Sequence, residues 1–178
     1  MAGLLKDTGI DLKDKVVLDA GASTGGFVQV ALLAGASKVF AVDVGYGILD
    51  WTLRNDPRVV VMERTNARYL KKTDFSSCPE IGMLDLSFIS LKKVLPVFFE
   101  IIEDSIIALM KPQFEASREE MAGTGGVVQD LEIHERLKEE FSCFPDNYGW
   151  ICRGIYSSVI KGRKGNQEFF IHYEKIRA

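Results

Sequence analysis

Three charged residues stand at positions from which their side chains could act on one chemical group. Asp85 ends an apolar run that begins at Ile81. Lys111 ends a second run that begins at Ile106, and Glu168 opens a β-rich run near the C-terminus. A lysine whose pKa is lowered by burial can take a proton from a weakly acidic hydroxyl group or stabilise the alkoxide, although adjacent carboxylates shift that pKa upward. We expect Lys111 to activate a hydroxyl nucleophile while the two acids orient it.

Each of these residues also has a structural interpretation. Asp85 could cap the following turn with Ser87, Lys111 could extend from a strand end into solvent, and Glu168 could pair with Lys164. The start of an antiparallel strand lies at the same sheet edge as the ends of its parallel neighbours. Open α/β sheets bind ligands at that edge. The common position therefore favours a catalytic role for the three residues over three separate structural ones.

A second group of residues predicts a cofactor site. The segment 19–26, Asp-Ala-Gly-Ala-Ser-Thr-Gly-Gly, joins the first expected strand to the first helix. Glycines let the backbone approach a ligand, and a helix N-terminus offers free amides that suit a carboxylate such as that of S-adenosyl-L-methionine. Asp43, after the next strand, could accept both ribose hydroxyls of an adenosine. The expected cofactor-binding residues are Asp19, Gly21, Ser23, Thr24, Gly25, Gly26, Asp43, Glu63 and Asn66.

Alternatives remain for this cofactor site. A nicotinamide-binding domain would need glycine where Ser23 stands, and Asp19 is more typical of methyltransferases. A tight turn without a ligand is a third interpretation. Glu63–Asn66 follows the third strand, where an adenine ring would lie, but Thr65 or Asn66 could equally cap a helix. His134 and His172 are isolated, so no metal site is predicted.

The order of the expected elements predicts an α/β fold. Apolar runs indicate strands at residues 15–20, 38–43, 58–62, 81–85 and 106–111. Helical patterns lie at residues 25–34, 48–54, 66–72, 91–103 (where Pro96 is expected to cause a distortion) and 130–141. Two β-rich runs, 150–160 and 167–173, flank a turn at 161–166. Apolar strands alternating with helices predict the class I, Rossmann-like methyltransferase fold: a mostly parallel seven-stranded sheet with a C-terminal antiparallel hairpin.

Length and composition suit one domain over residues 1–178. The formal net charge of −3 is unusual for a nucleic-acid binder, although residues 161–178 carry five Lys/Arg against two Glu. Three widely spaced cysteines argue against a disulfide framework and a zinc site. The N-terminus carries charge too early for a signal peptide, and no apolar run is long enough to span a bilayer unaided. We therefore expect a cytoplasmic protein without stable membrane insertion.

Other segments have less certain roles. The loop 115–129 is rich in glycine and charge and could be a lid that orders the substrate, or a mobile surface loop. Tyr46, Trp51 and Phe88 could stack on a base or on adenine, but we expect them to pack in the core or at its rim.

The same residues resemble a known family, the TlyA family of FtsJ-like methyltransferases, often labelled hemolysin. The resembling segments, in order over almost the whole chain, are 19–27, 42–46, 56–59, 63–68, 85–91, 111–115, 125–128 and 165–169. The resemblance implies cytidine 2′-O-methylation in ribosomal RNA of both subunits, with a lysine-aspartate-lysine-glutamate tetrad. By motif match, Asp85, Lys111 and Glu168 resemble the last three members of that tetrad.

Two features of that family are not matched here. Its first lysine lies in a Gly-Gly-x-Lys-Leu stretch that should fall just before Met1, and Lys6 is not at the matching place. The family also carries a small N-terminal RNA-binding domain. We expect a truncated catalytic domain that keeps cofactor binding, with ribosomal RNA or ribosomal subunits as partners and an oligomeric state that the sequence does not indicate. The alternatives are a membrane-active hemolysin and, less favoured, a nicotinamide-dependent dehydrogenase.

Overall fold

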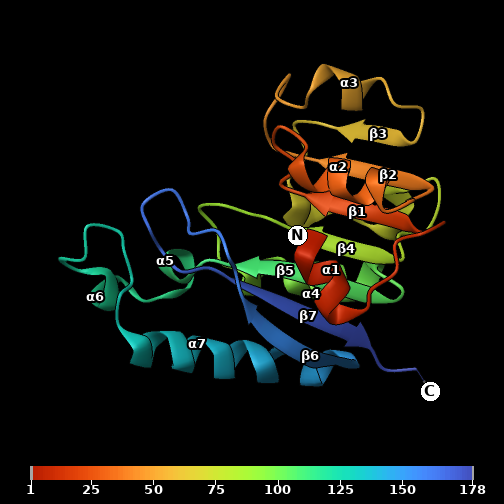
Figure 1. Ribbon diagram of the computed structural model, residues 1–178. Coiled ribbons are helices and arrows are strands. Elements are labelled where there is room, and N and C mark those ends of the chain that lie inside the picture. Colours follow the sequence, from red (N-terminus) through yellow and green to blue (C-terminus); the bar gives the residue numbers. More distant parts are fainter. Residues whose placement is uncertain (1, 178) are drawn as a thin grey trace.

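A twisted seven-stranded sheet forms the centre of the molecule (Figure 1), in a computed structural model that describes residues 2–177. Its strand order is β3-β2-β1-β4-β5-β7-β6. The strands are β1 (Val16–Ala20), β2 (Lys38–Val42), β3 (Val59–Met62), β4 (Ile81–Leu84), β5 (Ser105–Met110), β6 (Trp150–Ser157) and β7 (Phe169–Lys175). The first five are parallel, and β7 runs antiparallel to both β5 and β6. This topology confirms the predicted class I methyltransferase fold.

Helices cover both faces of the sheet. The α-helices are α1 (Ala2–Thr8), α2 (Gly26–Leu33), α3 (Trp51–Arg54), α4 (Leu95–Ile101), α5 (Pro112–Glu115), α6 (Arg118–Met121) and α7 (Leu131–Cys143). The 3-10 turns are η1 (Ala67–Tyr69), η2 (Lys72–Asp74), η3 (Leu91–Lys93) and η4 (Phe144–Tyr148). Residues of α4 and α7 share one apolar cluster, while α1 and α2 contribute to clusters on the other face. Successive strand residues therefore bury side chains on alternate faces, as a doubly covered sheet requires.

Two predicted helices are shorter than expected, and in each a capping residue marks the start of the short turn that does form. The helix expected at 48–54 begins only at Trp51, since Gly47 has a φ of 70° and the Asp50 side chain accepts a hydrogen bond from the amide of Thr52. The helix expected at 66–72 is wrong: Asn66 caps only the 3-10 turn η1, after which the backbone becomes extended. An N-cap residue starts a helical turn but does not sustain it.

Pro96 lies in a first helical turn, where a proline is tolerated, and the distortion expected at this residue is not seen within α4. The predicted helix 91–103 is divided into η3 and α4, and α4 starts at Leu95, which places Pro96 in its first turn. There a proline loses no hydrogen bond, because the first amides of a helix have no partner within it. The final two strands also differ at their ends from the expected runs, with β6 ending at Ser157 and β7 starting at Phe169, one residue after Glu168.

Candidate active site

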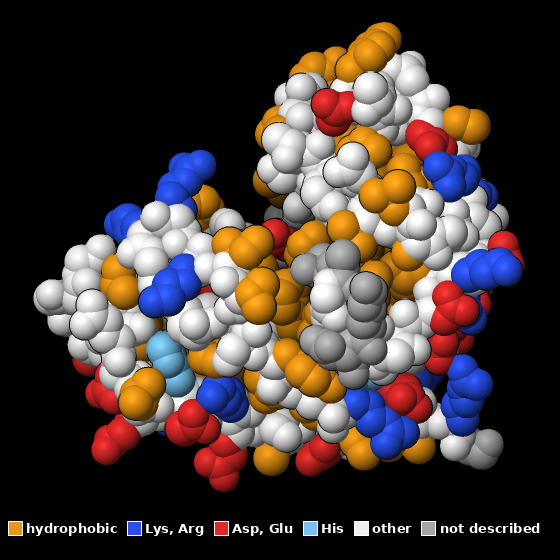
Figure 2. Space-filling view, in the orientation of Figure 1, with side chains coloured by type: hydrophobic (Ala, Val, Ile, Leu, Met, Phe, Trp, Pro, Cys, Tyr) orange, Lys and Arg blue, Asp and Glu red, His pale blue; other side chains and the backbone are white. Residues whose placement is uncertain are grey.

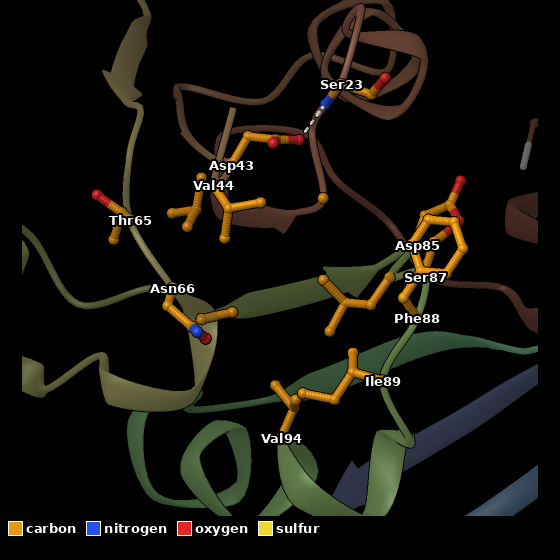
Figure 3. A pocket seen from close by; sticks show the side chains of 14 residues that line it. Ser23, Asp43, Val44, Thr65, Asn66, Asp85, Ser87, Phe88, Ile89 and Val94 are labelled. Carbon is orange, nitrogen blue, oxygen red and sulfur yellow. Dashed lines mark hydrogen bonds between the residues drawn. The ribbon is translucent and has the colours of Figure 1, made fainter. Parts of the chain in front are cut away.

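A cavity of about 460 Å³ opens at the carboxyl ends of β1, β2 and β4, and we call it the first cavity (Figure 3). Of the expected cofactor residues, Gly21, Ser23, Asp43 and Asn66 line it. Its remaining walls come from Val42, Val44, Thr65, Ala67, Asp85, Leu86, Ser87, Phe88, Ile89 and Val94. In Figure 3, Asp43 and Ser23 lie on one side and Ile89 and Val94 on the other. The cavity thus combines one acidic end with a largely apolar slot.

The carboxylate of Asp43 is held in place by two backbone amides. Ser23 N donates to Oδ2 at 2.8 Å, and Gly45 N donates to Oδ1 at 2.7 Å. Ser23 adopts a φ of 48°, in the left-handed region that non-glycine residues use seldom. Each oxygen retains a lone pair for a further donor. A fixed carboxylate with free lone pairs is suited to accept the two hydroxyls of a ribose.

The glycines of the first turn have different physical roles. A Cβ on Gly21, whose φ is 84°, would lie 2.2 Å from the carbonyl oxygen of Asp85, so the end of β4 requires glycine there. A Cβ on Gly25, with a φ of 103°, would lie 2.2 Å from Cδ1 of Leu53. A glycine at this position therefore leaves room for the Leu53 side chain of α3. Thr24 and Gly26, like Gly25, are not in the wall of the first cavity. The sequence pattern alone did not separate contact with a ligand from close packing.

Asp19 lies beneath the first cavity rather than in its wall. Its side chain is fully buried, and neither carboxylate oxygen has a hydrogen-bond partner within residues 2–177. The pKa of Asp19 is raised to about 8, chiefly by burial and secondly by the negative charge of Asp85. The N–H of Val28 acts in the opposite direction without reaching hydrogen-bond geometry. A role for Asp19 in cofactor binding stays a prediction.

Glu63 and Asn66, expected near an adenine ring, are placed differently. Glu63 accepts a hydrogen bond from Gly47 N at 2.7 Å and forms an ion pair with Arg54, so it ties the end of β3 to the segment before α3. Asn66 lines the first cavity and also caps η1, accepting from Arg68 N at 3.0 Å. The two interpretations of Asn66 are therefore compatible, whereas Glu63 is outside the cavity wall.

Lys111 lies at the junction between the first cavity and a second one. Its Nζ is 2.6 Å from Oδ1 of Asp85 and donates to Oγ of Ser87 at 3.0 Å. The Lys111 side chain is 11% exposed, whereas that of Asp85 is 35% exposed. Asp85 lines the first cavity, whereas Lys111 lines the second. Ser87, which the sequence analysis considered only as a capping residue, lines both.

Glu168 completes the acidic surroundings of Lys111. It lines the second cavity, whose volume is about 530 Å³, together with Lys111, Ser87, Phe88, Gln113, Phe114, Met121, Gly126, Arg163, Lys164 and Asn166. Burial raises the pKa of the Glu168 carboxyl; Lys111 counteracts this, and Asp85 adds to it. The described residues show no ion pair between Glu168 and Lys164, whose Nζ instead donates to the carbonyl of Gly125 at 3.4 Å. The structure thus brings Asp85, Lys111 and Glu168 together at one edge of the sheet.

The loop 115–129 is ordered by contacts that the sequence did not reveal. It contains α6, which Ser117 and Glu120 cap reciprocally, and Arg136 of α7 pairs with Glu120 at 2.8 Å. The side chain of Asn166, 2% exposed, accepts from Val128 N and donates to Gly126 O, both at 2.9 Å. The interpretation of a free surface loop therefore does not hold, because a buried amide anchors the segment beside Glu168.

Three aromatic residues expected in the core or at its rim do not pack in the core. Tyr46, Trp51 and Phe88 are 69%, 73% and 90% exposed. The Arg64 guanidinium lies 4.3 Å from the centre of the Tyr46 ring. Phe88 has a φ of 64°, and the centre of its ring is 5.3 Å from that of Phe114. These rings are available to stack on a ligand.

Two further expectations concern metals and membranes. No group of three or more potential metal ligands occurs among the described residues. His134 is buried with its ring edge-on to Phe169, so it has a packing role. None of the helices between residues 2 and 177 is both long and apolar enough to cross a bilayer. The side chain of Lys6 lies outside the described residues.

A mostly parallel seven-stranded sheet in this strand order, with a final antiparallel pair, is the fold of the class I methyltransferases. The chain belongs to the family of FtsJ-like methyltransferases, whose model matches residues 1–175. This result confirms the family predicted from the sequence motifs.

Individual relatives support the assignment. The chain is 46% identical over 171 residues to YqxC of Bacillus subtilis, covering 94% of this chain and 60% of that protein. It is 43% identical to the 16S/23S rRNA (cytidine-2′-O)-methyltransferase TlyA of Mycobacterium tuberculosis, covering 96% and 64%. A solved structure described as a hemolysin from Streptococcus thermophilus superposes with a TM-score of 0.94 at 42% identity, covering 99% and 64%. The chain therefore spans somewhat less than two thirds of these relatives.

Proposed function

We propose that this chain catalyses transfer of a methyl group from S-adenosylmethionine to the 2′-hydroxyl of a ribose, that of a cytidine in ribosomal RNA. The observation that carries the proposal is the position of Lys111 between the two cavities, with Asp85 and Ser87 as its neighbours. Such an arrangement can present a nucleophile to a methyl donor from the opposite cavity. The named activity of the mycobacterial relative supports the choice of substrate.

The first cavity fits the cofactor. The fixed carboxylate of Asp43 would accept the ribose hydroxyls, and Asn66 offers hydrogen-bonding groups toward an adenine ring. Val44, Ile89 and Val94 supply the apolar walls that a purine needs. When bound, the cofactor supplies an activated methyl group on a sulfonium centre. These residues would hold the cofactor in the first cavity.

The second cavity supplies the chemistry for the hydroxyl group. A ribose hydroxyl is a weak acid and must lose its proton as its oxygen forms the new bond to carbon. The Lys111 ammonium stabilises the negative charge on that oxygen, and the Asp85 carboxylate paired with it takes up the proton. As the new oxygen–carbon bond forms, the bond between the methyl carbon and sulfur breaks, and its electron pair stays on sulfur. Ser87 and Glu168 orient the lysine and the substrate from either side. Holding the oxygen in line with the methyl group contributes further acceleration.

Surface features near both cavities suit RNA. Arg163 and Lys164 line the second cavity, and Figure 2 shows Lys and Arg side chains on the part of the molecule formed by α5, α6 and the β6–β7 turn. On the other side of the first cavity, Arg64 stacks on the exposed Tyr46, and Arg68 lies 5.5 Å from the ring centre of Tyr69. Aromatic and guanidinium groups stack on unpaired bases, and cationic groups bind phosphates. These local features offset the net charge of −3. A ribosomal substrate implies a cytoplasmic location.

The proposal is tested by locating the transferred methyl group. The intact protein is incubated with methyl-labelled cofactor and unmethylated ribosomal subunits, and the RNA is then hydrolysed with alkali. A 2′-O-methyl group blocks alkaline cleavage at its own nucleotide, so the label should appear in an alkali-resistant dinucleotide. Label in mononucleotides would indicate base methylation and would refute the ribose assignment.

Binding measurements separate the rival functions. Calorimetry should show binding of S-adenosylhomocysteine in preference to NAD. Preferential NAD binding would instead support the dehydrogenase. Leakage of dye-loaded liposomes at low protein concentration, independent of the cofactor, would support the hemolysin.

A further inference from the structure

A partly buried carboxylate joins the two segments that carry Asp85 and Lys111. Glu115 is the last residue of α5, and its Oε2 accepts a hydrogen bond from Ser90 Oγ at 2.6 Å. Its Oε1 accepts a second bond from the amide of Leu91 at 2.8 Å. Burial raises the pKa of the Glu115 carboxyl, whereas these two donors and the charge of Lys92 lower it. The pKa of Glu115 stays above its ordinary value, so the hydrogen bonds offset only part of the cost of removing the group from water.

Glu115 is the last of a series of contacts between segments 85–91 and 111–115. At the start of the series, Nζ of Lys111 contacts Asp85 and Ser87. In the middle, the Phe88 and Phe114 rings lie 5.3 Å apart. At the end, Glu115 holds Ser90 and Leu91. The two segments thus contact each other at both ends and, through Phe88 and Phe114, between them.

The segment 85–91 needs such support because its backbone is strained. Phe88 has a φ of 64° without being a glycine, and its side chain is 90% exposed, so burial of the ring does not stabilise the conformation. Strained positions persist only where surrounding contacts determine them. Ser90 also caps η3 by accepting from Lys92 N at 3.2 Å. Glu115 therefore acts on the point at which the strained segment joins regular structure.

We propose that Glu115 is a positioning residue: by fixing the end of segment 85–91, it sets where Asp85 and Ser87 stand around Lys111. This inference rests on the proposed methyl transfer. Glu115 itself lines neither the first nor the second cavity. Glu115 acts through the backbone between Ser90 and Asp85. The positions of Asp85 and Ser87 then determine where the Lys111 Nζ lies, and so how well the hydroxyl group is aligned.

The test compares three variants of the intact protein at a temperature where circular dichroism shows each to be folded. Glu115→Ala removes both acceptors, and kcat for methyl transfer should fall on the order of 10- to 100-fold, since small misplacements of catalytic groups cost about that much. The KM for RNA should stay within a few-fold. Glu115→Gln should restore kcat to within a few-fold, because its oxygen accepts from Leu91 and its amide donates to Ser90. The exposed Glu119, four residues further along, gives the control Glu119→Ala, which should match the wild type.

A second measurement is independent of turnover. Hydrogen–deuterium exchange of a peptide covering residues 86–91 should be faster in Glu115→Ala than in the wild type and Glu115→Gln. Ser90→Ala, which removes one of the two bonds and keeps the carboxylate, should give a smaller loss of kcat in the same direction. This milder variant replaces Glu115→Ala if that protein does not fold.

The outcomes separate this inference from the proposed function. If the wild type transfers methyl groups and both Glu115→Ala and Ser90→Ala retain its kcat, the positioning role is wrong. If Glu115→Gln is as impaired as Glu115→Ala, the charge rather than the hydrogen bonds matters, and the inference also fails. An inactive wild type would contradict the proposed function alone, and the exchange rates would still decide whether Glu115 fixes the segment.

Discussion

The two cavities are built in different ways, although they lie side by side. The polar end of the first is made by short turns directly after strands, and backbone amides of Ser23 and Gly45 fix its central carboxylate, Asp43. The second is made by segments far apart in sequence, which side chains join: Glu115 links α5 to Leu91, and Asn166 links the β6–β7 turn to Val128. A site formed by short turns at strand ends can be predicted largely from the order of residues along the chain. A site whose loops are held together by side-chain contacts depends on the tertiary fold.

The difference has a chemical counterpart. A cofactor is the same molecule in every turnover, so a compact set of short turns can hold it. In the proposed reaction, a segment of a large RNA must enter, be aligned and leave, and loops joined by a few side chains would permit that. The variants below separate the two cavities, beginning with the largest expected effect.

Replacing Lys111 by alanine should abolish the chemistry of the second cavity while sparing the first. Loss of a group that assists proton transfer lowers rates roughly 10²- to 10⁴-fold, so kcat should fall by at least that range. The affinity for S-adenosylhomocysteine, measured by calorimetry, should stay within a few-fold. The exposed Lys13 provides a charge-matched control, Lys13→Ala. Turnover at the wild-type rate would exclude Lys111 from the mechanism.

Asp43→Ala should produce the opposite pattern. Hydrogen bonds to a charged group contribute about 1.5–3 kcal/mol, so the Kd for S-adenosylhomocysteine should rise roughly 10- to 150-fold. Once the cofactor is saturating, kcat should recover, because the surroundings of Lys111 are unchanged. Asp146→Ala, at an exposed aspartate, controls for the loss of charge. An unchanged Kd would mean that Asp43 only shapes the turn around Ser23.

Asn166→Ala should affect the second cavity more moderately. It leaves the amide of Val128 and the carbonyl of Gly126 without their partner, which costs about 1–3 kcal/mol in local stability. Residues 115–129 should exchange their amide hydrogens faster, and kcat/KM for RNA should fall while cofactor affinity remains constant. The exposed Asn147 offers the control Asn147→Ala. Equal exchange rates in the two variants would show that Asn166 does not anchor the loop.

Asp19 allows a test of burial beneath the first cavity through the pH dependence of stability. Its pKa is about 8 in the folded protein against an ordinary value of 3.8, so the unfolded chain loses this proton at lower pH than the folded one. The contribution to the free energy of unfolding is therefore greatest below about pH 4 and falls as the pH rises toward 8. Asp19→Asn should flatten this fall in a series of thermal melts, and Asp146→Asn should not. A parallel fall in both variants would show that Asp19 ionises freely.

Much of the fold could be predicted from local sequence. Apolar runs such as 81–84 read as buried strands because both faces of the sheet are covered, and the final antiparallel pair follows from the turn at 161–166. Helices were less predictable. Asn66 and Asp50 act as caps in the structure, but the length of a helix after its cap depends on what it packs against, as the short η1 and α3 show.

The candidate site shows the same contrast between features that the sequence determines and features that the tertiary structure determines. Residue types and their order determined that Asp43, Asp85, Lys111 and Glu168 would meet at the carboxyl edge, because strand direction fixes which end of each strand lies there. Only the tertiary structure decided that Gly21 makes room for Asp85, that Glu63 is held by Arg54, and that the side chains of Glu115 and Asn166 hold the loops. The physical reason is that such contacts join residues distant in sequence, and no local pattern of residues encodes which of them will touch.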